Sequence, residues 1–292
     1  MLGDEYVNCG SQPLDEKSLH LRRLVMRALR AADKGHVGSA LSMIEIFRAL
    51  YESVARHDPA NPKWEGRDRI ILSKGHGCLA LYALLADQGY IDLAALDRFC
   101  ERDALLGGHP ERDPEHGIEA STGALGHGLP LAVGMAIAHK RKASGVRVFV
   151  VVGDGELDEG SNWEALLIAA KYKLANLTMI VDNNSEQISG SLDTVLPIEP
   201  LREKFESFGL ITANVDGHDL ASVVEALVRV SSRVQGPPAA VICHTIKGKG
   251  VSFAEQNPQW HYKRGLDPKT LAHLDEELAS ARQIGSPAGT ER

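Results

Sequence analysis

Two amphipathic patterns open the chain and predict helices. The first is a set of apolar residues spaced three, four, seven and eight positions apart, in a helix that begins just after Pro13. Its members are Leu21, Leu24, Val25, Ala28, Leu29 and Ala32. The second pattern begins at Ser42, where Ser42 and Glu45 have the spacing of a capping box and an apolar stripe continues to Val54. The chain is therefore expected to begin with a helical portion.

Short apolar runs rich in β-branched residues follow, and helical patterns separate most of them. The runs cover residues 69–72, 146–152, 177–181, 211–215 and 239–243. Strands that are apolar on both faces and are joined by helices favour a parallel sheet buried between helical layers. We therefore expect an α/β fold with a doubly wound, mostly parallel sheet flanked by helices. A single domain is expected to cover residues 1–284, followed by a flexible tail at 285–292.

Polar residues come directly after two of these runs, where the loops of a parallel sheet present ligands. Asp154 lies between two glycines after the run 146–152, and Asn184 ends a polar triplet after the run 177–181. A helix predicted at 162–173 joins the two strands. Oxygen donors of this kind suit Mg²⁺, and glycines let the backbone approach a phosphate. A lone Gly-Asp-Gly is usually a tight turn, but the two strand ends together favour a metal-diphosphate site.

Two other ligand classes compete for this segment. An EF-hand calcium loop would need glycine at the sixth position and glutamate at the twelfth, where the chain has Glu159 and Ala165. A dinucleotide site would need G-x-G-x-x-G after a strand and before a helix, and no such motif occurs. Both alternatives are therefore disfavoured.

Composition limits the partners. The chain has 32 basic and 39 acidic residues, a net charge of −7 and no long basic cluster, which disfavours nucleic acid. Its longest apolar runs are too short to span a membrane, and its acidic start has no secretory signal. The four cysteines form no CxxC pair, which is typical of reduced thiols in a cytoplasmic protein.

The segment 153–184 resembles the thiamine-diphosphate motif in its transketolase form. Further motifs of that family occur in the family's order, and the resemblance covers about residues 15 to 265. These motifs are GHVG at 35–38, LSKGHG at 72–77, GHPE at 108–111, STGALGHG at 121–128 and KGKG at 247–250. The chain is identified by them as a member of the transketolase family.

The resemblance implies a role for each matching residue. Asp154, Asn184 and the backbone carbonyl of Glu186 match the Mg²⁺ ligands. The cofactor contacts it implies are His76 and Gly155 near the diphosphate, Gly123 and Leu125 at the aminopyrimidine, and Glu159 in an interface with a second protomer. The catalytic set it implies is His36, His76, His109 and His261, of which His36, His109 and His261 line the substrate channel.

Some positions depart from the family's pattern or allow two interpretations. Tyr262 follows His261 where a glycine is expected, and His127 takes the place of a common glutamine. The KGKG motif suits either a phosphate clamp or a flexible turn, and we favour the turn. Four other histidines are expected to be solvated: His20, His57, His139 and His273.

The resemblance covers one of the two α/β domains that thiamine-diphosphate enzymes use. It implies the N-terminal subunit of a split transketolase, which transfers a two-carbon ketol unit from a ketose to an aldehyde. A separate pyrimidine-domain subunit would carry the activating glutamate, most simply in an α₂β₂ assembly, and the substrates would be sugars or sugar phosphates. Two alternatives stay open: the α-subunit of a 2-oxoacid dehydrogenase or decarboxylase, and a non-catalytic thiamine-diphosphate-binding subunit.

Overall fold

Five parallel strands form the central sheet, and each coincides with a predicted run. The computed structural model describes residues 9–10 and 13–284, so the predicted tail at 285–292 lies outside the described residues. The strand order is β2-β3-β4-β6-β5, and every neighbouring pair is parallel. The strands are β2 (Arg69–Leu72), β3 (Val148–Gly153), β4 (Leu177–Asn183), β5 (Ile211–Asp216) and β6 (Ala239–His244). The predicted parallel sheet is confirmed.

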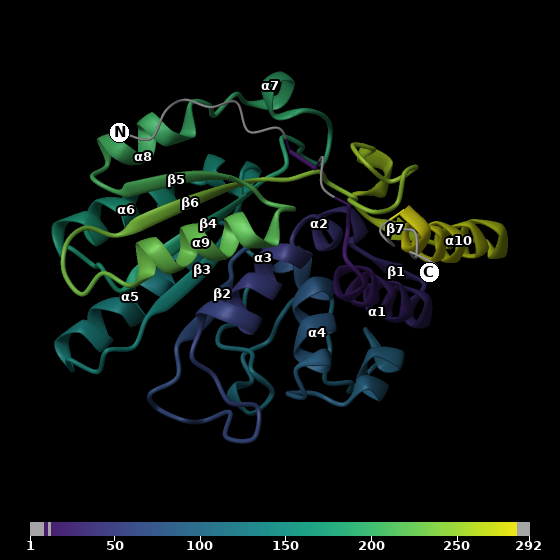
Figure 1. Ribbon diagram of the computed structural model, residues 1–292, viewed down its shortest axis with the longest axis horizontal. Coiled ribbons are helices and arrows are strands. Elements are labelled where there is room, and N and C mark those ends of the chain that lie inside the picture. Colours follow the sequence, from purple (N-terminus) through teal and green to yellow (C-terminus); the bar gives the residue numbers. More distant parts are fainter. Residues whose placement is uncertain (1–8, 11–12, 285–292) are drawn as a thin grey trace, which may run out of the picture.

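Helices cover both faces of the sheet. Alternate side chains of each central strand point to opposite faces, so they enter two different cores. In β3, Phe149 and Val151 enter one core, whereas Val148 and Val150 enter the other. The first core contains α1 (Glu16–Ala32), α2 (Val37–Ser42), α3 (Ile44–Arg48), α4 (Cys78–Asp87), α9 (Leu220–Ser231) and part of α10 (Pro268–Ile284). The second contains α5 (Gly128–Arg141), α6 (Gly160–Lys171), α7 (Leu192–Val195) and α8 (Leu201–Ser207). The doubly wound prediction is thus confirmed (Figure 1).

One predicted strand is buried less than expected. β5 forms an edge of the sheet, so only one neighbour pairs with it. Ile211 at its start is 39% exposed. An edge strand keeps one side open to solvent, which explains the departure from the two-faced burial expected of central strands.

The first predicted helix is confirmed, but the predicted capping box is wrong. α1 begins after Asp15, whose carboxylate accepts a hydrogen bond from the Ser18 amide. Ser42 ends α2 instead of capping a helix, and its hydroxyl donates to Ser39 and Asp182. Glu45 turns into the core, where tertiary partners satisfy its carboxylate. The spacing of Ser42 and Glu45 therefore does not produce a cap, because both side chains are buried and bind partners elsewhere in the chain.

Short elements complete the chain. β1 (Lys34–Gly35) pairs antiparallel with β7 (Lys263–Arg264), so two segments far apart in sequence lie side by side near α1 and α10 (Figure 1). The 3₁₀ helices are η2 (Gly75–Gly77), η3 (Leu93–Arg98), η4 (Pro114–His116), η5 (Gly155–Asp158) and η6 (Pro258–Trp260), and η1 (Ala49–Val54) is a π-helix. Within the described ranges, no helix combines the length and apolarity that crossing a membrane requires.

Candidate active site

A cavity of about 380 Å³ opens at the carboxyl edge of the sheet. The loops that follow β2, β3, β4 and β6 all contribute to it, as expected for a parallel α/β sheet. Its lining consists of His36, Ser39, Lys74, His76, Gly123, Leu125, Gly153, Asp154, Gly155, Glu156, Asn184, Glu186, Gln187, Ile188, Ser189, Lys247 and His261. Most of the site residues predicted from the sequence are therefore brought together.

Asp154 directly follows β3, and two backbone amides hold its carboxylate. The amide of Gly155 donates to Oδ1 at 2.8 Å, and that of Ser185 donates to Oδ2 at 2.6 Å. Burial raises the pKa of Asp154 to about 6, and the charge of Asp182 adds to the rise, whereas the charge of Lys74 opposes it. The two amides fix the direction in which this carboxylate faces the cavity.

Asn184 and Glu186 lie beside Asp154 in the loop after β4. Oδ1 of Asn184 accepts from the Glu186 amide at 3.1 Å, and its Nδ2 donates to Asp182 at 3.2 Å. Glu186 also lines the cavity, and its carbonyl accepts a hydrogen bond from Lys247, whereas Oε2 of its side chain is buried with no hydrogen-bond partner among the described residues. We call Asp154, Asn184 and the Glu186 carbonyl the oxygen floor.

Two buried ammonium groups also line the cavity. Lys74 and Lys247 are 1% and 2% exposed. Lys74 donates to Asp182 at 2.6 Å, and Lys247 donates to the carbonyls of Glu186 and Gln187 at 3.2 Å each. Burial lowers the pKa of Lys247, and the nearby charge of Lys74 lowers it further. Buried cations that face a cavity suit an anionic ligand.

The two lysines show what the sequence interpretation missed. The KGKG motif does form a turn, with positive φ at Gly248 and Gly250, yet Lys247 of that turn also reaches the cavity. The paired Ser-Lys before Gly75 was the available signal for Lys74. Asp182, the partner of Lys74, begins the polar triplet that ends at Asn184, but nothing local shows that its buried carboxylate also accepts from Ser42 and Thr245.

Four histidines gather on another side of the cavity, and we call His36, His76, His109 and His261 the histidine wall. The ring of His36 lies in the middle, with centroids 5.4 Å from His76, 5.9 Å from His109 and 5.3 Å from His261. His109 does not itself line the cavity and is exposed, but its ring lies next to that of His36. Tyr262 packs against His36 at 4.8 Å.

Burial keeps the three cavity-lining histidines of the wall neutral near pH 7. It lowers the pKa of His36 to about 4, with the charges of His109 and Lys247 adding to the effect. Burial and the charge of Lys247 lower the pKa of His261 to about 3, and burial holds the pKa of His76 far below the ordinary range. Nε2 of His76 lies 3.1 Å from the Ser39 hydroxyl, and Nδ1 of His261 is buried without a hydrogen-bond partner in the described chain.

The loop that carries Gly123 and Leu125 is held close to the end of β2. A Cβ on Gly75 would lie 2.7 Å from the backbone of Thr122, so only glycine permits this approach. Gly123 has φ +153° and lies against the ring of His109. Buried Glu156, which the sequence interpretation also missed, accepts from Ser73 and from the amides of Gly126 and Gly153.

Three other sequence predictions have mixed outcomes. Glu159 lies outside the cavity and is exposed in the single chain, at the start of α6. His127 is also exposed. His57 is not simply solvated, because it is half-buried between the Tyr90 hydroxyl and the Tyr51 carbonyl. Its surroundings come from segments distant in sequence.

Comparisons with known proteins agree with this geometry. The family model for the transketolase thiamine diphosphate binding domain matches residues 15–277. An apulose-4-phosphate transketolase subunit from Actinobacillus succinogenes is 43% identical over 257 residues, covering 88% of this chain and 92% of that protein. The 6-deoxy-6-sulfo-D-fructose transketolase subunit SqwG of a Clostridium species is 40% identical over 235 residues, which cover 80% of this chain and 85% of that protein.

The fold also matches solved transketolases. The transketolase of Campylobacter jejuni is similar with a TM-score of 0.81 at 29% identity, over 92% of this chain and 46% of that longer one. The chain belongs to the transketolase family, and it corresponds to the thiamine-diphosphate-binding domain of that family.

Proposed function

We propose that this chain is the thiamine-diphosphate-binding subunit of a two-component transketolase. The observation that carries the proposal is a single cavity that combines the oxygen floor, two buried ammonium groups and a wall of imidazoles. Relatives of similar length that are named as transketolase subunits support the division into two chains. We also propose that residues 1–284 form the single domain that carries this function. The protein would act in the cytoplasm.

The residues at the floor fit a magnesium ion. No three His, Cys, Asp or Glu side chains gather as a metal site in the part of the chain that the structure describes. Mg²⁺ does not need such a cluster, since it is commonly bound by one or two carboxylates together with phosphate and water. Asp154, Asn184 and the Glu186 carbonyl would hold the ion, and the buried cavity-lining oxygens are the observation in favour.

The cations and the glycine-rich loops fit the rest of the cofactor. Lys247, His76 and Gly155 would bind the diphosphate, while Gly123 and Leu125 would contact the aminopyrimidine. Thiamine diphosphate, when bound, supplies the carbanion chemistry that breaks and forms carbon–carbon bonds next to a carbonyl. The protein's share is to bind and orient the cofactor and to exclude water.

The histidine wall would bind the polyol and move its protons. Neutral imidazoles can both donate and accept, so they suit exchange with sugar hydroxyls near pH 7. Nδ1 of His261 is buried and has no partner in the described chain, whereas the Ser39 hydroxyl lies within hydrogen-bond distance of Nε2 of His76. A wall of this kind favours a ketose donor and an aldehyde acceptor, with or without phosphate, over a 2-oxoacid.

The partner would be a pyrimidine-domain transketolase subunit in an α₂β₂ assembly. Ile188 lines the cavity although 71% of its surface is exposed, and Glu159 is exposed beside the Gly126 loop. An apolar side chain at the mouth and an open carboxylate suit a surface that a second subunit covers. Glu159 would then face the activating glutamate of the other protomer.

Mixing the two subunits tests this function. The chain alone, with saturating thiamine diphosphate and Mg²⁺, should show no ketol transfer, because the activating glutamate lies in the other subunit. Activity should appear on adding a pyrimidine-domain transketolase subunit, and native mass spectrometry should find α₂β₂ particles. Robust turnover by the chain alone, with co-purifying partners excluded by mass spectrometry, would contradict the two-component assignment.

A further inference from the structure

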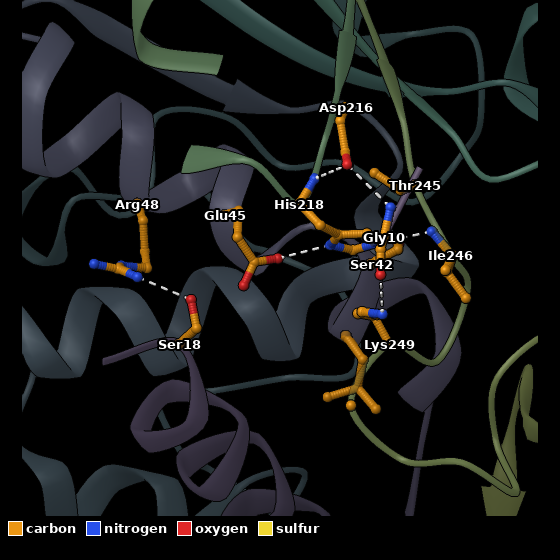
Figure 2. Close-up of polar contacts among 12 residues, drawn as sticks. Gly10, Ser18, Ser42, Glu45, Arg48, Asp216, His218, Thr245, Ile246 and Lys249 are labelled. Atoms are coloured by element: carbon orange, nitrogen blue, oxygen red, sulfur yellow. Dashed lines mark hydrogen bonds and ion pairs between the residues drawn. The ribbon is translucent and has the colours of Figure 1, made fainter. Parts of the chain in front are cut away.

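Three charged or titratable side chains form a buried cluster outside the cavity. Arg22 of α1, Glu45 of α3 and His218 of the loop after β5 are each no more than 4% exposed. Arg22 binds the Glu45 carboxylate with two donors, Nη1 at 2.6 Å and Nη2 at 3.0 Å. Nδ1 of His218 lies 2.9 Å from Oε2 of the same carboxylate (Figure 2). None of the three lines the cavity.

The hydrogen bonds fix the tautomer of His218. The backbone amide of Ile246 donates to Nε2 at 2.8 Å, so Nε2 carries no proton in this contact (Figure 2). Nδ1 is then protonated and donates to Glu45. Burial opposes the ionisation of Glu45, but the Arg22 charge and the bonds from His218 and Arg22 hold its pKa well below the usual range. The carboxylate therefore remains an acceptor for both neighbours.

The same cluster also holds the chain on the other side of Lys247. Nε of Arg22 donates to the Lys249 carbonyl at 2.8 Å. The amide of Ile246 and the carbonyl of Lys249 thus bracket Lys247 and are held by side chains that Glu45 orients. The Gly248 amide, which donates to the Gly38 carbonyl at 3.1 Å, adds a third fixed point.

We propose that Arg22, Glu45 and His218 act as a positioning clamp, which holds residues 246–249 so that the ammonium of Lys247 faces the cavity in a fixed position. The role of Lys247 toward the diphosphate rests on the proposed function, whereas the clamp itself is a statement about this chain's backbone. The three clamp residues are positioning residues because they act only through the turn that they hold.

Two amide variants of His218 separate its two hydrogen bonds. The amide of glutamine reaches the position of Nε2, so His218→Gln keeps an acceptor for Ile246. The amide of asparagine reaches only the position of Nδ1, so His218→Asn keeps a donor to Glu45 and leaves the Ile246 amide unsatisfied. The variants are matched in polarity and in the absence of charge, and melting temperatures report whether each folds.

Hydrogen–deuterium exchange of the full chain gives a readout that needs no ligand. Peptides covering residues 246–249 should exchange about tenfold faster in His218→Asn, because a buried amide loses its acceptor, and close to the wild-type rate in His218→Gln. Thiamine diphosphate titrated calorimetrically into the assembled enzyme with Mg²⁺ should bind about tenfold more weakly to His218→Asn only.

Arg22→Lys tests the other arm and serves if the asparagine variant does not fold. A lysine keeps the charge beside Glu45 but cannot also reach the Lys249 carbonyl, so segment exchange should again rise and affinity fall. Wild-type exchange in both His218→Asn and Arg22→Lys would overturn the clamp. Faster exchange with unchanged affinity, in an enzyme that Lys247→Ala does weaken, would also overturn it, because the held turn would then not position Lys247. Lys247→Ala, with Lys249→Ala as its control, tests the proposed function separately: wild-type affinity in Lys247→Ala would remove that lysine from the diphosphate site.

Discussion

The oxygen floor and the histidine wall face the same cavity but are held by different means. In the floor, backbone amides orient Asp154 and Asn184 from their own loops and, for one amide of Asp154, from the loop after the neighbouring strand. The whole set lies between residues 154 and 186. The wall draws four side chains from segments between residues 36 and 261, and ring packing at 5.3 to 5.9 Å holds them together. A set built from adjacent strand ends can be found from a local motif, whereas a wall of this kind exists only in the folded chain.

Removing the central carboxylate of the floor should have the largest effect. We expect Asp154→Ala to weaken thiamine diphosphate and Mg²⁺ binding about a thousandfold, beyond the roughly 10- to 100-fold that loss of an outer-sphere partner costs. The fold should persist, because the amides that bind Asp154 lie at a loop edge. Calorimetry on the assembled enzyme measures the affinity. The exposed Asp158, in the same loop, gives the control variant Asp158→Ala, and wild-type affinity in Asp154→Ala would remove Asp154 from the site.

A change in the wall should leave the cofactor bound and lower turnover. His109→Ala is expected to reduce kcat by about a hundredfold, within the range of acid–base contributions, with little change in cofactor affinity. His116→Ala is the matched control, since His116 lies in the same segment but pairs with Asp113 at 2.6 Å, outside the wall. Steady-state assays with the partner subunit would measure this. Turnover at the wild-type rate would give His109 a structural role only.

The smallest effect concerns stability at low pH. The pKa values of His36 and His261 in the folded chain are lowered to about 4 and about 3, whereas histidines in the unfolded chain have pKa values of about 6.5. The unfolded state therefore holds more protons in this window, and stability falls as the pH decreases from 6.5 toward 4. Substituting both histidines with phenylalanine keeps rings in the wall and should flatten this slope.

Urea unfolding at pH 5, 6 and 7 measures the slope. The exposed His127 provides the control variant His127→Phe, which should keep the wild-type pH dependence. An unchanged slope in the double variant would mean that the wall histidines take up protons as readily in the folded chain as in the unfolded one.

Sequence patterns could predict the sheet and the gathering of the floor residues for a physical reason. Buried parallel strands need continuous β-branched runs, and their polar ends must meet at one edge, so β3 and β4 bring Asp154 and Asn184 together. The histidine wall was reached through the family's motifs and not through spacing. Its packing around His36 depends on tertiary structure.

Other features could not be predicted because burial of a charged residue is decided by distant partners. Lys74 and Asp182 satisfy each other across two strands, and each alone would look like a surface residue. The same holds for Glu45, whose spacing from Ser42 suggested a helix cap but whose partners lie in α1 and after β5. At these positions, partners from distant segments decide where the side chain lies, and the local sequence pattern does not.

The ladder between β1 and β7 has a consequence for the order in which the chain assembles. It joins Lys34 to Arg264, so His36 and His261 can come together only after residues about 230 positions apart have met. β3 and β4 are neighbours in sequence and in the sheet, and their pairing closes a much shorter loop. We therefore expect the strand ends that carry Asp154 and Asn184 to form early in folding, and the imidazoles of His36 and His261 to join them later.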